Sequence, residues 1–423
     1  MRSHAVKRVP AVLLGVGLPA LEVARSLGRR GIEVIGVDWR RNWVSRSRYL
    51  ARMVCPNRED HVEMHKVLEQ LACEFPERPF LMPLRDDHVL FVSRHREALG
   101  RQYRFLEPAP EVLEGVVSKR GLWDLCHEIV PMPDTRFLDP HDDLQALASQ
   151  ITYPCIMKPE LSDDWSRYRP PMVTQEQKVI EIHSPADLLR VAALLGVTYG
   201  DTVIQEPIPG PDSNLYYLVA YLNGSGEPLA TFVGRKLRTC PPHFGNGTYV
   251  QSVHAPEVVE LGLRLLSKLR YRGSVGVEFK LDPRDGLFKL IEMNARFGLW
   301  DGFGAVCGVD FAYLAYADAV GLPLPSHNGY KAGVYWMQPD RDFWTALQYR
   351  RAGELTLGGW LRSILRCRVF APAAWDDPMP WFALNLSFGR ALASAAQGRL
   401  SGAVASALGR ATRHRDAQSG GRT

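Results

Sequence analysis

Two alternating segments, residues 274–282 and 287–298, place the strongest constraint on the fold of this chain. They read SVGVEFKLD and LFKLIEMNARFG, and the residues PRDG between them are typical of a turn. The pattern therefore predicts a β-hairpin. The second segment presents two faces, an apolar one with Ile291, Met293, Ala295 and Phe297 and a polar one with Glu292, Asn294 and Arg296.

The polar face of this hairpin predicts a cation site. If residues 284–286 form the loop, Glu278 lies directly opposite Glu292, and like charges that face each other at about 5 Å are destabilising. A positive group is therefore expected between the two carboxylates. With the amide oxygen of Asn294, and with no His or Cys nearby, the set favours Mg²⁺ or Mn²⁺ over zinc. The alternative is a polar strand face that points to water.

The composition is ordinary for a folded protein with two or three domains. The chain has 423 residues, of which 46% are hydrophobic and 23% are charged. Its seven cysteines are scattered and form no CxxC pair, which argues against a zinc site or a disulfide framework and favours a cytoplasmic location. No apolar run reaches the roughly 18 residues that a membrane-spanning helix needs.

The net charge of +5 is concentrated near the C-terminal end. From residue 381 onward six arginines stand against one acidic residue, Asp416, so the preceding residues are electrically balanced. A balanced body argues against a nucleic-acid partner. The Ala-rich basic end predicts one or two amphipathic helices, which either dock on the body, the favoured alternative, or make peripheral contact with an anionic membrane.

The first 40 residues predict a βαβ unit. A strand ends at Leu14, the turn Gly15-x-Gly17-x-x-Ala20 follows, and a second strand ends at Asp38. This spacing approaches the dinucleotide-binding fingerprint, but such glycines also serve any tight strand-to-helix turn. A Rossmann-like domain is therefore expected, and an NAD(P)-dependent oxidoreductase is one alternative function.

The order of the later motifs resembles the ATP-grasp superfamily. A lysine at residue 119 opens a helical segment, a strand ends at Lys158, and QEPIPGPD, GRKLR and the hairpin follow in that order. The resemblance covers roughly residues 1–325 and is strongest to the carboxylate–amine ligase branch, which includes D-aspartate ligase-like proteins. It implies an α/β fold with a Rossmann-like pre-ATP-grasp domain over residues 1–112, an ATP-grasp domain over 113–325 whose smaller lid subdomain spans about 151–208, and a C-terminal extension with a basic helical tail over 326–423.

The resemblance also implies roles for particular side chains. The metal ligands would be Glu278, Glu292 and Asn294, which would hold Mg²⁺ (or Mn²⁺) against the phosphates of ATP. The ATP-binding residues would be Lys119, Lys158 and Arg238 at the phosphates, Gln205, Glu206 and Ile208 at the adenine, and Asp212 at the ribose. The catalytic residues would be Arg296, Lys236 and Arg235, although Arg296 has an ion pair with Glu292 as its alternative. Alternation puts Lys236 and Arg238 on one strand face and Arg235 on the other.

One segment departs from the family pattern. Many ATP-grasp proteins close a glycine-rich loop over the phosphates, but ELSDDWSRYR after Lys158 contains no glycine. Ser162, Ser166 or Arg167 are the candidates to replace its backbone amides.

The expected function is that of an ATP-dependent ligase that joins a small-molecule carboxylate to an amine through an acyl phosphate and releases ADP and phosphate. Two alternatives besides the oxidoreductase stay open. One is an ATP-grasp carboxylase that uses bicarbonate, and the other is a nucleotide-binding module without turnover.

Overall fold

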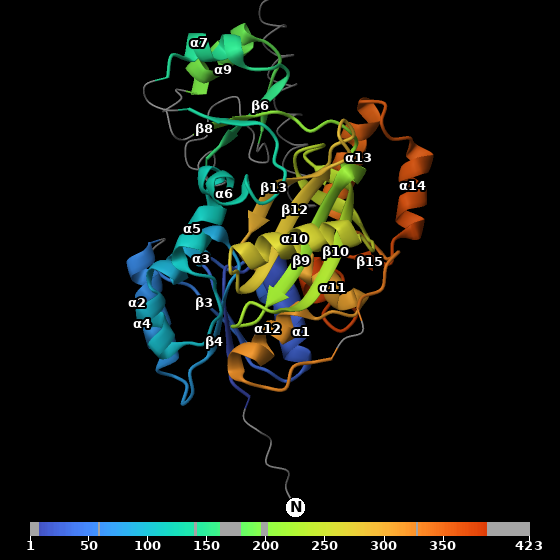
Figure 1. Cartoon of the computed structure of the whole chain (residues 1–423). Helices are drawn as coiled ribbons and strands as arrows, with labels where there is room; N and C mark the ends of the chain where they lie inside the picture. The colour runs from blue at the N-terminus through green and yellow to red at the C-terminus, as the bar shows by residue number, and fades with distance from the viewer. Residues whose placement is uncertain are drawn as a thin grey trace, which may run out of the picture.

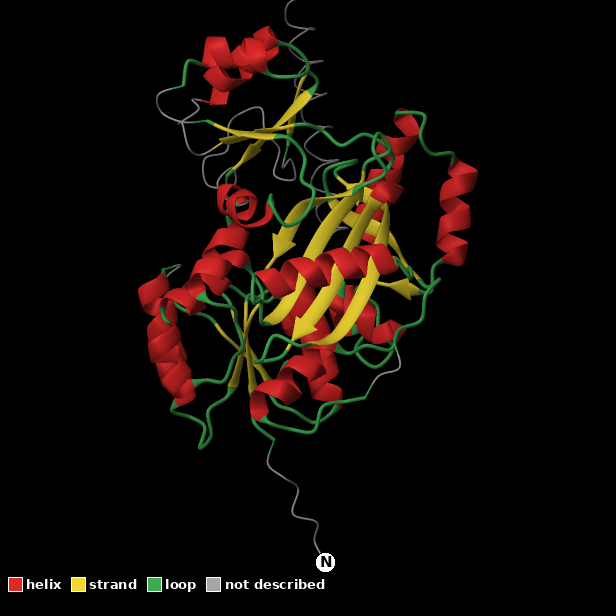
Figure 2. Cartoon of the chain, in the orientation of Figure 1, coloured by secondary structure: helices red, strands yellow, loops and turns green. Residues whose placement is uncertain are grey.

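The computed structural model describes residues 8–57, 60–138, 142–160, 179–195, 202–326 and 329–386. In this part of the chain three β-sheets are covered by helices, as Figure 1 shows along the chain and Figure 2 by secondary structure. The expectation of a mixed α/β fold is confirmed.

The first sheet has four parallel strands in the order β3-β2-β1-β4. Its strands are β1 (Ala11–Leu14), β2 (Val34–Val37), β3 (Arg52–Val54) and β4 (Phe80–Pro83), and its helices are α1 (Leu18–Arg29), α2 (His61–Ala72), α3 (Asp86–Arg94) and α4 (Arg96–Gln102). Every residue of β1 and β2 is buried, because α1 packs on one face of the sheet and α2, α3 and α4 pack on the other.

The second sheet is the largest, with seven strands in the order β13-β12-β9-β10-β11-β14-β15. The strands are β9 (Leu215–Leu222), β10 (Pro228–Cys240), β11 (Asn246–Ser252), β12 (Gly273–Leu281), β13 (Phe288–Asn294), β14 (Tyr335–Met337) and β15 (Val369–Phe370). The helix α10 (Pro256–Lys268) packs on one face, and α11 (Asp301–Cys307) and α12 (Phe311–Val320) pack on the other. The predicted hairpin is the pair β12–β13, and its antiparallel pairing is confirmed.

The segment beyond residue 325 is not a separate appendage of this sheet. Its strand β14 pairs with β11, and β15 pairs with β14. The helices α13 (Pro339–Arg351) and α14 (Leu357–Arg366) lie between these two strands in the sequence. The C-terminal extension predicted from residue 326 therefore completes one edge of the central sheet. The basic tail predicted after it falls largely on residues 387–423, outside the described residues.

The third sheet is small and antiparallel, with the order β5-β8-β6-β7. Its strands are β5 (Thr135–Phe137), β6 (Cys155–Pro159), β7 (Ile180–Ile182) and β8 (Thr202–Gln205), and α7 (Leu144–Gln150) and α9 (Pro185–Leu195) share its core. The sheet thus extends further toward the N-terminus than the interval 151–208 expected for the lid. Two helices, α5 (Pro110–Val117) and α6 (Lys119–Cys126), connect it to the first sheet.

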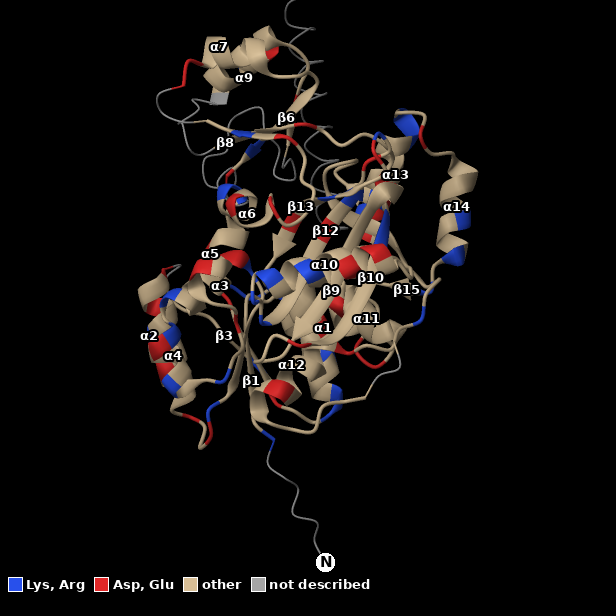
Figure 3. Ribbon diagram, viewed as in Figure 1, with Lys and Arg blue, Asp and Glu red and all other residues tan. Residues whose placement is uncertain are grey.

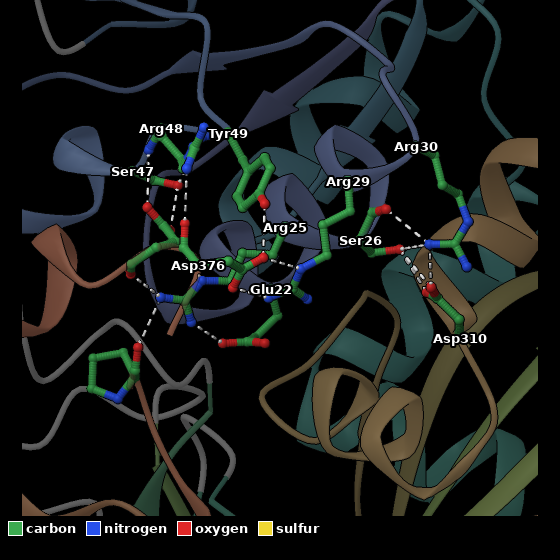
Figure 4. A network of polar contacts seen from close by, with 12 residues as sticks. Glu22, Arg25, Ser26, Arg29, Arg30, Ser47, Arg48, Tyr49, Asp310 and Asp376 are labelled. Atoms are coloured by element: carbon green, nitrogen blue, oxygen red, sulfur yellow. Dashed lines mark hydrogen bonds and ion pairs between the residues drawn. The ribbon is translucent and has the colours of Figure 1, made fainter. Parts of the chain in front are cut away.

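A polar network joins α1 to the last described segment of the chain (Figure 4). The buried guanidinium of Arg25 donates from Nε to Asp377 Oδ2 at 3.1 Å and from Nη2 to the carbonyl of Pro372 at 2.9 Å. One turn further along α1, Arg29 forms a two-pronged ion pair with Asp376 at 2.8 Å for each hydrogen bond. Residues 372–377 are therefore held against the first sheet.

No single helix in the described ranges is long and apolar enough to cross a membrane. Among the described helices, α11 and α12 taken together have the length and composition of a span, but the chain bends by 102° between them.

Candidate active site

A cleft opens where the large sheet faces the small sheet and the start of α6. Its walls come from β12 and β13, from Lys236 on β10, from β6 and the end of β8, and from the loop at residues 243–246. Nine of the predicted site residues line it: Lys119, Lys158, Gln205, Glu206, Ile208, Lys236, Glu278, Glu292 and Asn294. Residues spread over 175 positions of sequence therefore meet in one cavity.

Glu278 and Glu292 face each other across the hairpin, as the sequence predicts. The predicted loop over residues 284–286 is wrong, because Leu281 pairs with Phe288, one residue off the register that such a loop would give. A β-bulge makes up the difference: Phe279 pairs with Leu290 and leaves Ile291 as the extra residue, so that Glu278 meets Glu292. The bulge corrects the prediction that Ile291 lies on the apolar face of β13. Leu290 lies in the core, whereas Ile291 is half-buried and lines the cleft beside Glu292. As a result, the four consecutive residues 291–294 at the end of β13 all line the cleft.

A buried lysine neutralises one of these two carboxylates. Lys236 donates a hydrogen bond from Nζ to Oε2 of Glu278 at 2.7 Å, and the two side chains are only 4% and 10% exposed. Its ammonium also lies 5.2 Å from the ring centre of Trp300. An ammonium desolvated to this degree requires such a partner, so Lys236 and Glu278 form one structural unit.

Glu278, Glu292 and Asn294 form one side of the cleft, which we call the carboxylate wall. Lys158 projects from the end of β6 toward this wall. Its Nζ donates to Gln205 Oε1 at 2.8 Å, and Gln205 Nε2 donates to Thr135 Oγ1 at 2.9 Å. Burial, reinforced by the nearby charge of Lys119, lowers the pKa of Lys158 to about 8. A lysine that is poised near neutral pH and held in a cleft is suited to receive an anion.

The N-terminus of α6 borders the opposite side of the cleft. Ser118 caps this helix by accepting from the backbone N–H of Gly121 at 3.0 Å, and its hydroxyl donates to Glu160 Oε1 at 2.7 Å. Lys119 Nζ donates to the carbonyl of Glu160 at 3.2 Å. Arg120, the next residue, lies over Phe137 with its guanidinium 4.7 Å from the ring centre.

Lys280 is a cleft residue that sequence reasoning missed. It is buried on β12 two residues beyond Glu278, and its Nζ donates to the carbonyl of Ile208 at 2.6 Å. The alternation GVEFKL already put it on the same strand face as Glu278, and that signal was available in the sequence. Burial lowers its pKa.

No family model matches the chain. A D-aspartate ligase of Enterococcus faecium is 23% identical over 248 residues, which are 57% of this chain and 58% of the relative. A formate-dependent phosphoribosylglycinamide formyltransferase of Erwinia tasmaniensis is 30% identical over 165 residues, 38% of this chain and 39% of the relative. This chain thus spans less than two thirds of either curated relative.

Solved structures resemble the chain over more of its length. The L-amino acid ligase from Bacillus licheniformis superposes with a TM-score of 0.57 at 16% identity and covers 74% of each chain. An N5-carboxyaminoimidazole ribonucleotide synthetase in complex with ADP has a TM-score of 0.59 at 13% identity, over 77% of this chain and 81% of the other. Biotin carboxylase from Campylobacter jejuni has a TM-score of 0.58 at 16% identity, over 78% and 75%. The chain has the ATP-grasp fold.

At the edge of the cleft, the segment expected to meet adenine makes several contacts to the protein itself. The backbone N–H of Glu206 donates to the carbonyl of Asp134 at 2.9 Å, and the carboxylate of Glu206 accepts from Arg284 Nη2 at 3.0 Å. The carbonyl of Ile208 accepts from Lys280. The side-chain amide of Gln205, at the wall of the cleft, is bonded to Lys158 and Thr135.

Asp212 is placed differently from the expectation that it meets the ribose. It is 4% exposed and accepts hydrogen bonds from Thr239 Oγ1 at 2.8 Å, from His243 Nδ1 at 3.1 Å and from the hydroxyl of Tyr349. Burial would raise the pKa of Asp212, but these hydrogen bonds outweigh it and the pKa is lowered. Its carboxylate therefore anchors the loop that lines the cleft.

The two arginines of β10 also lie away from the cleft. Arg238 is buried and binds Asp342 on α13 through two hydrogen bonds of 2.9 and 2.8 Å, so the expectation that it contacts ATP is not supported. The pairing of β10 with β11 shifts on both sides of Arg238, which interrupts the alternation used for the prediction. Arg235 donates from Nε to the carbonyl of Ser213 and lies 5.5 Å from the ring centre of Tyr216.

Arg296 pairs with a residue that the sequence did not suggest. Its Nε donates to Asp86 Oδ1 at 2.7 Å, and its Nη2 donates to Asn294 Oδ1 at 3.1 Å. The expected alternative was an ion pair with Glu292, whereas Asp86 begins α3 in the first sheet's layer and itself lines the cleft. Desolvation opposes the charge of Arg296, but Asp86 outweighs it and the pKa is raised.

The donor set of the carboxylate wall fits a magnesium–nucleotide complex. Two carboxylates and one amide oxygen are hard ligands, and Mg²⁺ is usually held by one or two carboxylates together with phosphate oxygens. In the described ranges no cluster of three or more His, Cys, Asp or Glu side chains is arranged to hold a metal by itself. A bound nucleotide would therefore have to complete the coordination. The candidates for the missing glycine-rich loop, Ser162, Ser166 and Arg167, lie outside the described residues.

Proposed function

We propose that this chain is an ATP-dependent carboxylate–amine ligase. The observation that carries the proposal is the cleft in which the facing pair Glu278 and Glu292 lies opposite Lys158 and the start of α6. Such a cavity would hold divalent cations at the two glutamates and the phosphates of a nucleotide between those cations and the lysines. The similarity to a D-aspartate ligase and to an L-amino acid ligase supports the choice of reaction.

The cationic residues of the cleft would bind the triphosphate. Lys158 and Lys119 approach from the small sheet and from α6, and Lys280 and Lys236 approach from the large sheet. Mg²⁺ (or Mn²⁺) at Glu278, Glu292 and Asn294 would neutralise the phosphate oxygens on the other side. Because these groups are held by strands and buried hydrogen bonds, they would stabilise developing charge with little rearrangement.

ATP would supply the phosphoryl group that turns a carboxylate into an acyl phosphate, and attack by the amine would then give an amide, ADP and phosphate. Arg296 lies next to Asn294 and is held by Asp86, so it would orient the acid or its acyl phosphate near the metal ligands. Lys236 would hold Glu278 in position at the same wall. For Arg235 the contacts support a structural role in place of the catalytic one.

The finer division of the chain belongs to the same proposal. It comprises a Rossmann-like domain over residues 1–112, an ATP-grasp domain over 113–325 with a lid at about 151–208, and an extension over 326–423. The first sheet supports the first of these units, whereas β5 lies before the lid interval and β14 joins the extension to the large sheet. The seven cysteines all lie in the described ranges as free thiols, which supports a cytoplasmic location. The substrates would be small molecules, without a nucleic-acid partner.

A carboxylase that uses bicarbonate is the second candidate, since biotin carboxylase and a carboxyaminoimidazole ribonucleotide synthetase share the fold. The oxidoreductase alternative loses support from Asp38, which accepts from the backbone N–H groups of Val16 and Trp39 at 2.7 Å each. That carboxylate holds the turn after β1, although a dinucleotide site would need it for the ribose.

The test is a product analysis with pools of small acids and amino acids. We expect ADP and phosphate whose release depends on an acid, and a hydroxamate when hydroxylamine replaces the amine. Bicarbonate-dependent ADP release would favour the carboxylase. AMP and pyrophosphate would contradict transfer of the terminal phosphoryl group.

A further inference from the structure

The helix α14 carries an apolar stripe that faces away from the protein. Leu357, Leu361 and Leu365 are 49%, 49% and 85% exposed and follow the spacing i, i+4, i+8, which places them on one side of the helix. Figure 1 shows α14 at the periphery of the molecule. Single exposed leucines are ordinary, but three in register form a surface that is suited to a partner.

The leucine stripe is exposed because other side chains of α14 make its contacts with the rest of the protein. Trp360 donates from Nε1 to Asp342 Oδ2 at 2.9 Å, Ser363 is buried, and Ile364 packs with Cys367 against the edge of the large sheet. The side chains that anchor α14 are thus separate from the leucine stripe. Removing the three leucines would leave the anchoring contacts in place.

Basic side chains flank the stripe and no acidic ones interrupt it. Arg362 and Arg366 are exposed, and the sequence LGGWLRSILR contains no Asp or Glu. Along the ribbon of α14, Figure 3 shows basic but no acidic colour. Two further exposed aromatic residues, Phe343 and Trp344 on α13, lie nearby, with the ring centre of Phe343 at 5.9 Å from that of Trp360.

We propose that this α14 face, formed by Leu357, Leu361, Leu365, Arg362 and Arg366, docks on an anionic lipid membrane surface. A helix with leucines on one side and arginines beside them lies in the membrane interface with its apolar side chains inserted and its guanidinium groups at the headgroups. Neighbouring aromatic residues favour the same depth.

The positive charge of the α14 face favours a lipid surface over two other possible partners, a second copy of the chain and the chain's own residues 387–423. A symmetric contact between two copies would set the arginines of one α14 face against those of the other. The chain's own residues 387–423 hold six arginines and one aspartate, so they carry the same sign as the face. An anionic lipid surface is attracted by both basic segments, and the leucines of the α14 face add insertion, so the α14 face is expected to retain measurable binding to anionic vesicles by itself.

The test is vesicle flotation of the full chain. Vesicles of phosphatidylcholine alone are compared with vesicles that also contain phosphatidylglycerol, at low and high salt. We expect binding to the anionic vesicles only, weakened by salt. The test variant is Leu357→Ser/Leu361→Ser/Leu365→Ser, expected to bind on the order of tenfold or more weakly. Its matched control is Leu322→Ser/Leu324→Ser, two leucines that are 37% and 43% exposed elsewhere, expected to bind normally.

Three results would overturn the proposal. They are failure of the full chain to float with anionic vesicles, equal binding by the test variant and the parent, and complete loss of binding after truncation at residue 386 with α14 intact. Light scattering adds a fourth, a dimer of the parent that the test variant loses. ADP release measured on the same samples is expected to be unchanged, so this test fails or succeeds independently of the proposed ligase activity.

Discussion

Lys236 donates a hydrogen bond to Glu278 at 2.7 Å, and both side chains are almost completely removed from water. The pair stands directly opposite Glu292, so the carboxylate wall is partly neutralised by the protein itself. A divalent cation that binds there adds to an existing charge balance instead of creating one.

Replacing Glu292 by Gln is expected to abolish Mg²⁺-dependent ADP release while the melting temperature stays equal or rises. The reason is that one of two facing carboxylates is removed from the wall. The control is Glu257→Gln on the exposed side of α10, which is expected to change neither quantity. Normal turnover in the Glu292 variant would contradict the metal assignment.

Replacing Lys236 by Met is expected to destabilise the protein by about 3–5 kcal/mol, because Glu278 then remains buried without its counter-charge. The double variant Lys236→Met/Glu278→Gln is expected to regain most of this loss. Denaturant unfolding of the parent, both single variants and the double variant measures the coupling. Additive effects would show that the hydrogen bond contributes nothing beyond its two separate side chains.

The affinity for ATP is expected to fall as the pH rises through about 8. Lys158 has a pKa lowered to about 8 by burial, so below that pH it is protonated and above it the positive charge is lost. Nucleotide binding favours the protonated form, and the KM for ATP therefore increases above pH 8. In Lys158→Arg, which stays charged, the profile should be flat over this range; an unchanged profile would exclude Lys158 as the titrating group.

Replacing Tyr349 by Phe is expected to cost about 1–3 kcal/mol of stability and to raise the KM for ATP. The hydroxyl of Tyr349 bonds Asp212 and accepts from the backbone N–H groups of Thr239 and His243, at 3.3 and 3.4 Å, and so holds the loop that lines the cleft. Tyr330→Phe is the control, because its hydroxyl donates to the carbonyl of Val253 away from the cleft. If both variants lower stability but neither changes KM, the loop does not position the nucleotide.

The hairpin and the cleft residues near it were predictable because their geometry is local. The turn sequence and the alternation predict the two strands and the polar face that carries Glu292, but they do not determine the register: Leu281 pairs with Phe288, one residue away from the pairing that a loop over residues 284–286 would give. The bulge at Ile291 was not predictable from the alternation, and it brings Glu292 opposite Glu278, because the pairing next to the turn would otherwise place Ile291 there.

The contacts of Arg238, Asp212 and Arg296 differ from the predicted ones for another reason, which these three residues share. Arg238 and Asp212 look like free polar groups on a strand and a turn, but their partners Asp342 and Tyr349 lie more than 100 positions later, on α13. The same holds for Arg296 and Asp86, which are 210 positions apart. Composition and spacing within a segment carry no information on such partners, because they are brought together only by the packing of distant elements.

The contact between Arg25 and Asp377 has a consequence for protein synthesis. The two residues are 352 positions apart, so at about 5–20 residues per second roughly 20–70 seconds pass between their translation. During that interval the first sheet can form, but the guanidinium on α1 has only Glu22, one turn earlier on the same helix, as a counter-ion and lacks its contacts to Asp377 and Pro372. The nascent chain is therefore expected to keep this side of α1 open on the ribosome and to close it only when residues 372–377 emerge.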